Sequence, residues 1–399
     1  MKILMISSYL PYPLHSGGQV RLFNLVKELS GKHEITLICE NRDHQTIEDV
    51  KAVEKICKKV ITVARRKQWS IENIVKSVGS SQSFLVTGHT NLMMQKAIQQ
   101  ELAKQKFDLI HVETFYVMQN LVSNIPIVLV EHNIEYQVYK RFMDQTPLPV
   151  RPLLSWDIAK IKRNEEAAWS QATELVAVSD EDKKVMEQEG FSPAVVSNGV
   201  DIDKFSLKTQ KKQSFDAQRK ILFIGDFKWL QNRDSVKFVI EEVWPRISLK
   251  LKSENVQHTL WIVGRHIPES IRSLTNNPNV LFDEESSAKS TPEIFQEADV
   301  LLAPIRVGGG TSYKILESMA CGTPVVTMPL SASAIHANDG EQLMVGKNAS
   351  ELAEKTVSVL NDNKLYEKIG KGGRLLIEEK YSWKTIAKEL EKVYSQVVK

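Results

Sequence analysis

DVLLAPIRVGGGTSYKILESMACGTPVV, residues 299–326, begins with an apolar run that is typical of a buried parallel strand. A glycine-rich loop follows, and a second apolar run closes the segment. Between the loop and the second run, apolar side chains recur at helical spacing, with Ile315, Leu316, Met319 and Ala320 on one face. A strand, a helix and a second strand in this order predict one unit of a parallel α/β sheet.

The same alternation of short apolar runs with helical segments occurs along most of the chain. Two series of such runs are separated by a polar stretch without useful periodicity, Ser206–Gln218, which we interpret as a linker. We therefore predict two doubly wound, Rossmann-like domains that face a central cleft. The expected parts are a first domain at 1–205, the linker at 206–218, a second domain at 219–380, and a C-terminal helix at 381–399 that crosses back to the first domain.

Composition excludes several classes of protein. The 399 residues are 42% hydrophobic and 25% charged, as in an ordinary globular protein, and the net charge of +3 is too small to indicate nucleic-acid binding. Cys39, Cys57 and Cys321 are scattered, without a disulfide or zinc pattern. The first apolar run is too short for a signal peptide, and no run approaches the ~20 residues of a membrane helix. We expect a cytoplasmic protein.

The glycine-rich loop before the helix has the properties of an anion site. Glycine lets the backbone approach a ligand closely, and the first N–H groups of a helix attract negative charge. We expect Gly309, Gly310 and Thr311 to bind a diphosphate together with Lys314, and Thr311 or Ser312 to cap the helix. Glu317 lies on the same helix face as Lys314 and could accept bonds from sugar hydroxyls. A tight turn followed by a solvated Lys–Glu pair would explain the same residues without a ligand.

Other loops that follow strands supply further candidates, because ligands bind outside the carboxyl ends of strands in such sheets. They are Gly17 and Gly18 after KILMIS, His132 in EHNIEY after PIVLV, and Gly225 in GDFKW after KILFI. Asn133 or Glu135 could cap the helix after His132. Each of these residues also has a purely structural explanation: glycines make turns, and a histidine after a strand is often only hydrogen-bonded.

Several segments together resemble retaining glycosyltransferases of the GT-B fold, family 4. They are SYLPYPLHSGGQVRLFNLVKEL (8–29), LVAVSDEDKKVM (175–186), VVSNGVDIDKF (195–205), ILFIGDFKWLQNRDSVKFVIEEVWPRI (221–247), KILESMACGTPVV (314–326) and YSWKTIAKELEKVY (381–394). The resemblance implies transfer of a sugar from a nucleotide sugar to a saccharide, lipid-linked or other acceptor, with retention and with neither a metal nor another cofactor. It places His132 near the transferred sugar and the acceptor, and makes Glu317, Lys314 and His132 the candidate catalytic residues.

The sequence departs from the family pattern at the diphosphate site. The family has two glutamates eight positions apart; Glu317 matches the second, but the first position is Gly309. The family's Arg and Lys after the first strand of the second domain correspond to Asp226 and Gln231. A leaving diphosphate needs positive charge, so we expect Arg265, Arg306 and Lys314 to replace them.

Alternative functions remain open from the sequence. A nucleotide-sugar 2-epimerase shares the architecture, and a non-catalytic partner subunit would tolerate the missing residues. A nicotinamide dehydrogenase would need G-x-G-x-x-G after a strand, which neither KILMIS nor KILFIG provides. The basic stretch Lys51–Lys76, with Trp69 beside it, could contact an anionic membrane at the inner face, although a solvated surface is the commoner explanation.

Overall fold

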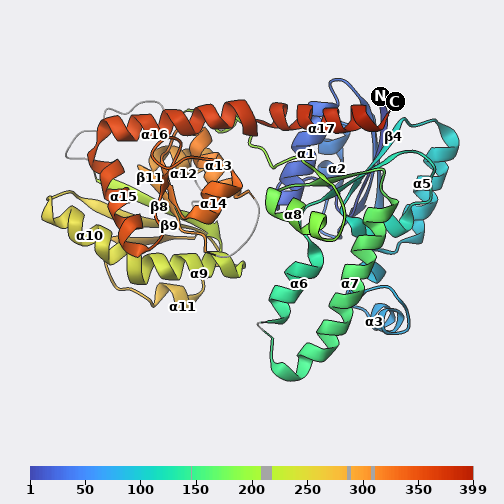
Figure 1. Ribbon diagram of the computed structural model, residues 1–399, viewed down its shortest axis with the longest axis horizontal. Coiled ribbons are helices and arrows are strands. Elements are labelled where there is room, and N and C mark those ends of the chain that lie inside the picture. The colour runs from blue at the N-terminus through green and yellow to red at the C-terminus, as the bar shows by residue number, and fades with distance from the viewer. Residues whose placement is uncertain (145, 208–217, 285–288, 307–310, 399) are drawn as a thin grey trace. The chain divides into compact units, whose positions relative to one another are not determined.

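The computed structural model describes residues 1–144, 146–207, 218–284, 289–306 and 311–398 (Figure 1). The chain divides into two compact units. The first comprises Met1–Ser197 and the C-terminal segment that begins at Ile386; the second comprises Asn198–Thr385. Most of the predicted linker, residues 208–217, lies outside the described residues.

The first unit is built on a seven-stranded parallel sheet in the order β3-β2-β1-β4-β5-β6-β7. Its strands coincide with the apolar runs of the sequence, which confirms those predictions: β1 Lys2–Ser7, β2 Glu34–Asn41, β3 Lys59–Ala64, β4 Leu109–Glu113, β5 Ile127–Glu131, β6 Glu174–Ala177 and β7 Ala194–Val195.

The helices of the first unit join and cover these strands (Figure 1). They are α1 Gly17–Leu29, α2 Ile47–Glu54, α3 Ile71–Val78, α4 Phe84–His89, α5 Leu92–Lys104, η1 Phe115–Asn120, α6 Glu135–Met143, η2 Leu148–Val150, α7 Arg151–Gln171, α8 Asp180–Gln188 and most of α17 Trp383–Val397.

The second unit contains a six-stranded parallel sheet in the order β10-β9-β8-β11-β12-β13. Counted from β8, this is the Rossmann order 3-2-1-4-5-6. The strands are β8 Arg219–Asp226, β9 His258–Arg265, β10 Val280–Asp283, β11 Val300–Ala303, β12 Val325–Thr327 and β13 Met344–Val345. The two-residue strand β13 was not predicted, because so short a run carries no measurable period.

The helices of the second unit lie on both faces of this sheet. One core cluster joins β8 and β9 to α9, η3, α10 and α15, and another joins the same sheet to α12 and α13. The helices are α9 Leu230–Phe238, η3 Val239–Val243, α10 Trp244–Ser253, α11 Glu269–Arg272, α12 Thr291–Glu297, α13 Tyr313–Ala320, α14 Pro329–Ala334, α15 Ala349–Asn361, α16 Asn363–Leu376 and η4 Ile377–Tyr381.

The sequence predicts one helix from about Asn232 to Ile247, but this segment is not a uniform helix. It consists of α9, a π-helical segment η3, and α10, whose second residue is Pro245. Proline donates no backbone hydrogen bond and its ring crowds the preceding turn, so the register changes immediately before it. Periodicity alone did not reveal this change.

The chain passes from the first unit to the second after Ser197, earlier than the expected boundary at 205. The backbone N–H of Val200 donates to the carbonyl of Tyr381 at 2.8 Å, and Phe205 packs in a core cluster of the second unit. A Cβ built on Gly199 would lie 2.9 Å from the ring of Trp383. These contacts attach residues 198–205 to the second unit.

Each sheet has one point where the strand order reverses, between β1 and β4 in the first unit and between β8 and β11 in the second. Ligands of doubly wound sheets bind outside the carboxyl ends of the strands at such points. The topology therefore predicts ligand sites at the carboxyl ends of β1 and β4 in the first unit and of β8 and β11 in the second.

Candidate active site

In the second unit, α13 begins close in sequence to the end of β11. Ser312 occupies the N-cap position but its side chain makes no capping bond, and Thr311 Oγ1 is buried without a hydrogen-bond partner among the described residues. Ser312, one of the two predicted residues, is therefore the N-cap of α13, but it does not cap the helix through its side chain. Gly309 and Gly310 lie outside the described residues.

Lys314 is tied to the end of β8 through one amide side chain. Its Nζ donates to Asn232 Oδ1 at 2.8 Å, and Asn232 Nδ2 donates to the carbonyl of Asp226 at 2.8 Å. The ammonium also lies 5.1 Å from the ring centre of Phe223. Burial lowers the pKa of Lys314 to about 8, although Glu317 opposes the change. The site thus holds a cation that is short of compensating negative charge.

Glu317 lies one turn after Lys314 and is half-buried. Burial raises the pKa of its carboxyl group to about 8, although Lys204 and Lys314 oppose the change. The opposite face of α13 is buried as predicted, with Ile315, Leu316, Met319 and Ala320 at most 1% exposed. The helix is therefore fixed by its apolar face, and near neutral pH it presents a carboxyl group that can be protonated.

The two arginines expected at this site differ in their surroundings. Arg306 forms a bidentate ion pair with Asp234 on α9, with N–O distances of 3.1 and 2.7 Å, and its guanidinium lies 4.4 Å from the ring centre of Phe238. Arg265 is exposed at the end of β9. Sequence reasoning did not identify Asp234 as the partner of Arg306, because the two residues are 72 positions apart.

Gly225 makes room for the amide that binds Lys314. A Cβ built on Gly225 would lie 2.8 Å from the side chain of Asn232. The next residue, Asp226, accepts from the backbone N–H of Lys228 at 2.9 Å and contacts His266 Nδ1 at 3.1 Å. Burial raises the pKa of Asp226, but these partners lower it further, so that it lies below its usual value. Asp226 is thus already engaged, and Asn232 is a residue of the site that sequence reasoning missed.

The first unit brings Gly18 and His132 together. Gly17 is the first residue of α1, after the N-cap Ser16, and His132 follows the end of β5. A Cβ built on Gly18 would lie 3.2 Å from His132 Nδ1 and 2.9 Å from the hydroxyl of Tyr9. A larger residue at position 18 would therefore have to displace the side chain of Tyr9 or His132.

On the side of the ring away from Gly18, His132 is hydrogen-bonded to the buried carboxylate of Glu113. His132 Nε2 is hydrogen-bonded to Glu113 Oε2, and His111 Nε2 lies 2.8 Å from Glu113 Oε1. Although burial raises it, the imidazoles of His132 and His111 hold the pKa of Glu113 well below its usual range. Sequence reasoning missed both partners; the signal was a His and a Glu in the otherwise apolar run DLIHVE.

The helix after His132 is not capped as predicted. The backbone N–H groups of Glu135 and Tyr136 donate to the carboxylate of Glu165 on α7, at 2.8 and 3.2 Å. Neither Asn133 nor Glu135 serves as the cap, and the N-cap position is Ile134. A long-range carboxylate has replaced the local cap.

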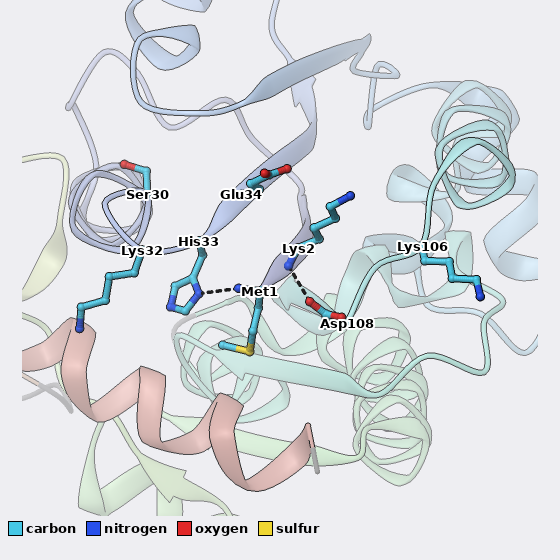
Figure 2. A pocket seen from close by; sticks show the side chains of 8 residues that line it. All are labelled: Met1, Lys2, Ser30, Lys32, His33, Glu34, Lys106 and Asp108. Atoms are coloured by element: carbon cyan, nitrogen blue, oxygen red, sulfur yellow. Dashed lines mark hydrogen bonds between the residues drawn. The ribbon is translucent and has the colours of Figure 1, made fainter.

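A separate pocket of about 640 Å³ lies at the amino ends of the strands of the first sheet (Figure 2). Its walls include residues that precede or begin β1, β2 and β4: Met1, Lys2, Ser30, Lys32, His33, Glu34, Lys106 and Asp108. Figure 2 shows His33 directed toward the terminal amine and Asp108 toward the backbone of Lys2. Because these are amino ends of strands, we do not assign the pocket to the active site.

Comparison with solved structures defines the fold class. Sucrose-phosphate synthase from Thermosynechococcus elongatus superposes with a TM-score of 0.68, covers 99% of both chains and is 15% identical. HepE from Anabaena in complex with UDP-glucose gives a TM-score of 0.66 at 15% identity, over 99% of this chain and 100% of HepE. Two parallel Rossmann-like sheets arranged as in these proteins constitute the GT-B fold.

Family models cover most of the sequence. Residues 15–204 match glycosyltransferase family 4, and residues 218–362 match the model described as glycosyl transferases group 1. The chain therefore belongs to the group 1/family 4 glycosyltransferases, a family of retaining enzymes, as the sequence resemblance indicated.

Curated relatives include a mannosyltransferase and a capsular polysaccharide glycosyltransferase. A phosphatidyl-myo-inositol mannosyltransferase of Mycobacterium leprae is 28% identical over 56% of this chain and 59% of its own length. A 44.6 kDa protein from the cps region of Klebsiella pneumoniae is 22% identical over 100% and 99% of the two chains. The capsular polysaccharide biosynthesis glycosyltransferase CapM of Staphylococcus aureus is 27% identical over 59% and 64%. The chain thus spans only 59% of the length of the first of these relatives.

Within the part of the chain that the structure describes, no helix is both long and apolar enough to span a membrane.

Proposed function

We propose that this chain moves a sugar from a nucleotide-diphosphate sugar to a saccharide or lipid-linked acceptor, with retention of configuration. The nucleotide sugar binds the second unit, outside the ends of β8, β9 and β11. The acceptor binds the first unit beside Gly17, Gly18 and His132. The observation that carries the proposal is Lys314, a half-buried ammonium at the N-terminal turn of α13 that has a neutral amide as its hydrogen-bond partner among the described residues.

The proposed role of this cation is to stabilise the leaving group. When the bond between the sugar and the diphosphate breaks, negative charge grows on the phosphate oxygens. A cation and helix N–H groups that are already in place stabilise this charge more in the transition state than in the ground state. Lys314 and the backbone of Thr311 contribute here, and we assign the same role to Gly309 and Gly310.

The remaining candidates have supporting roles. Arg265 and Arg306 add positive charge near the diphosphate, and Arg306 must exchange Asp234 for a phosphate to do so. Glu317 binds hydroxyls of the ribose or of the donor sugar, as donor when protonated and as acceptor when ionised. His132 contacts the transferred sugar and the acceptor through Nδ1, the nitrogen that faces Gly18.

The relatives suggest which ligands to try first. HepE is known in complexes with UDP and UDP-glucose, which makes these the first donor-site ligands to test. The mannosyltransferase and CapM are named for a phosphatidyl-inositol acceptor and for capsule synthesis. A lipid-linked acceptor at the cytoplasmic face of the membrane, in envelope polysaccharide synthesis, would be consistent with both.

A nucleotide screen tests the donor site. UDP, GDP, ADP and their sugars are added to the purified chain, and the melting temperature is measured. A ligand at a hundredfold excess over its Kd stabilises the protein by about 2.7 kcal/mol. Failure of all these ligands to raise the melting temperature would overturn the donor-site assignment.

Product analysis then tests the reaction. Transfer to an added acceptor supports the glycosyltransferase. Release of an epimerised sugar without acceptor would instead indicate a 2-epimerase, and turnover only in the presence of a second protein would indicate a non-catalytic subunit.

Contact with an anionic membrane is a second element of the proposal. In α3 the polar Asn73 and Ser77 are buried, whereas Ile71, Ile74, Val75 and Val78 are 45–82% exposed. Trp69 before the helix is 83% exposed. An apolar helix face that points outward beside lysines is suited to a lipid surface.

The basic stretch itself is less positive than its sequence suggests. Lys58, Lys59, Arg66 and Lys76 have acidic partners, with N–O distances of 2.6–3.4 Å to Glu34, Glu101 and Glu72. The apolar face of α3 is therefore the better predictor of membrane contact.

Vesicle sedimentation tests this contact. We expect binding to phosphatidylglycerol vesicles that is lost in Ile71→Ser/Val75→Ser. The matched control is Leu249→Ser, which removes an equally exposed side chain from α10 of the second unit. Equal binding by both variants would contradict the assignment.

A further inference from the structure

A chain of four side chains runs through the first unit from the C-terminal helix to His132. Tyr394, on α17, places its hydroxyl 2.7 Å from His111 Nδ1. His111 Nε2 contacts Glu113 Oε1 at 2.8 Å, and Glu113 Oε2 is hydrogen-bonded to His132 Nε2. Tyr394, His111 and Glu113 are fully buried, whereas the side chain of His132 is 15% exposed. The chain of bonds therefore leads outward from the core to the candidate site.

The charge of Glu113 fixes the direction of the two bonds that it makes. An ionised carboxylate only accepts hydrogen bonds, so both imidazoles direct an Nε2–H at Glu113. When its ring is neutral, His111 carries no proton on Nδ1, and this nitrogen then accepts from the hydroxyl of Tyr394. Burial keeps the pKa of Tyr394 well above its usual value, so the hydroxyl retains its proton for donation.

The same reasoning determines which nitrogen of His132 faces the ligand. Because Nε2–H is directed at Glu113, the neutral His132 has its unprotonated nitrogen, Nδ1, on the side of Gly18. That nitrogen can accept a hydrogen bond from a sugar or acceptor hydroxyl. If His111 took the other tautomer, Glu113 would lose one donor and the constraint on His132 would weaken.

We propose that Tyr394, His111 and Glu113 are positioning residues that set the tautomer and ring orientation of His132. This inference rests on the proposed function of His132 as a ligand of the sugar or acceptor. It assigns a role in the first unit's site to a residue of the closing helix that lies 283 positions from His111 in the sequence.

A purely structural role explains the arrangement less well. Fully buried polar networks contribute little net stability compared with apolar side chains of similar volume, and they are costly when one partner is missing. Among the described residues, the core-facing nitrogens and oxygens of this network are matched by hydrogen bonds, and the nitrogen for which no such bond is seen is Nδ1 of His132, beside Gly18. A network of this kind determines orientation more than it determines stability.

Nitrogen-15 NMR of the histidine side chains tests the inference without requiring turnover. The spectra of the wild type, Tyr394→Phe and Tyr366→Phe are compared, with His132 assigned from the signals lost in His132→Gln. Tyr366 on α16 is the matched control, because its hydroxyl is buried without a hydrogen-bond partner among the described residues. We expect the wild type to show His132 protonated at Nε2, and Tyr394→Phe alone to shift its ring signals.

Kinetics supply the second readout, with the donor selected by the nucleotide screen. Tyr394→Phe is expected to lower kcat about tenfold at an unchanged donor KM, by analogy with the loss of about 10- to 100-fold when the outer partner of a metal-bound histidine is removed. His132 signals in Tyr394→Phe that coincide with the wild type, an equal change in Tyr366→Phe, or an unchanged kcat would each overturn the inference. The NMR result stands apart from the proposed function, because it does not depend on any donor or acceptor.

Discussion

The two units hold their candidate residues in opposite ways. In the first, Glu113 accepts from two imidazoles, and His111 is hydrogen-bonded at both nitrogens. In the second, Lys314 has one amide partner and Thr311 Oγ1 has none among the described residues. Among the described residues, the polar groups of the first candidate site are bonded to one another, whereas the cation of the second has a neutral amide as its hydrogen-bond partner, as we propose for a site that receives a diphosphate.

The carboxylates make the same contrast. The pKa of Glu113 is held well below its usual range, whereas that of Glu317 is raised to about 8. Burial opposes ionisation in both, so the difference comes from the partners: two imidazoles touch Glu113, and only more distant cations influence Glu317. The partners of a buried group, rather than burial itself, decide whether it stabilises the fold or is poised for a ligand.

The largest expected effect follows from removing the cation of the second site. Lys314→Met preserves length and apolar volume but removes the charge, and should lower kcat/KM about 10²- to 10³-fold, the usual loss of one transition-state donor. Calorimetry with UDP should show weakened binding as well. Lys252→Met, on the exposed side of α10, is the control. Near-normal turnover in Lys314→Met would remove this residue from the mechanism.

Opposite stability changes are expected from the two carboxylates. Glu113→Gln should lower the free energy of unfolding by about 2–5 kcal/mol at pH 7, because a buried charge network loses its shared acceptor. The loss should shrink as the pH falls below the unfolded-state pKa, since stability from a depressed carboxyl pKa is present only above it.

Glu317→Gln should instead raise the melting temperature, by roughly 2–4 °C for each kcal/mol gained. Because the carboxyl pKa of Glu317 is raised in the folded state, the wild type loses stability as the pH rises from the unfolded-state pKa toward the folded value of about 8. Glu317→Gln removes this loss, so the stability that it gains over the wild type should be larger at pH 8 than at pH 5. Urea and thermal unfolding at several pH values measure both variants. Equal signs for the two substitutions would contradict the contrast between the sites.

Nucleotide binding should depend on pH above 8. A diphosphate raises the pKa of Lys314 above its ligand-free value of about 8, so binding takes up a proton between the two values. The affinity for UDP should therefore fall up to about tenfold per pH unit above pH 8. Ionisation of Glu317 acts in the same direction. Lys314→Arg, which stays charged, should flatten the dependence, and an unchanged slope would exclude Lys314 as its source.

The smallest effect concerns the surface pair of Arg306. Asp234→Asn removes an ion pair of partly exposed side chains and should change the free energy of unfolding by less than about 1 kcal/mol. If Arg306 binds the diphosphate, the variant should bind UDP a few-fold more tightly. In the wild type Arg306 must first break its ion pair with Asp234, and in the variant this pair is absent. Unaltered or weaker binding of UDP would argue against this role of Arg306.

Sequence patterns predicted the strands and most helices, because these elements depend on residues that are close together in the chain. Apolar runs such as KILMIS and HTLWIVG are strands of two doubly wound sheets because their side chains are apolar on both faces. The π-helical segment before Pro245 and the two-residue β13 were missed, since neither produces a period. Among the site residues, Lys314, Arg306 and His132 were visible in the sequence, but their partners Asn232, Asp234 and Glu113 were not.

Spacing along the chain was enough to predict the fold class, the family, and one helix with an apolar inner face and a Lys and a Glu on its other face. Tertiary structure alone decided what each charge meets: Tyr394 reaches His111, Glu165 caps α6, and Asp234 pairs with Arg306. Electrostatic and hydrogen-bonding energies act over a few ångströms of space, whatever the distance along the chain. The protonation and orientation of the candidate residues therefore follow from the folded arrangement.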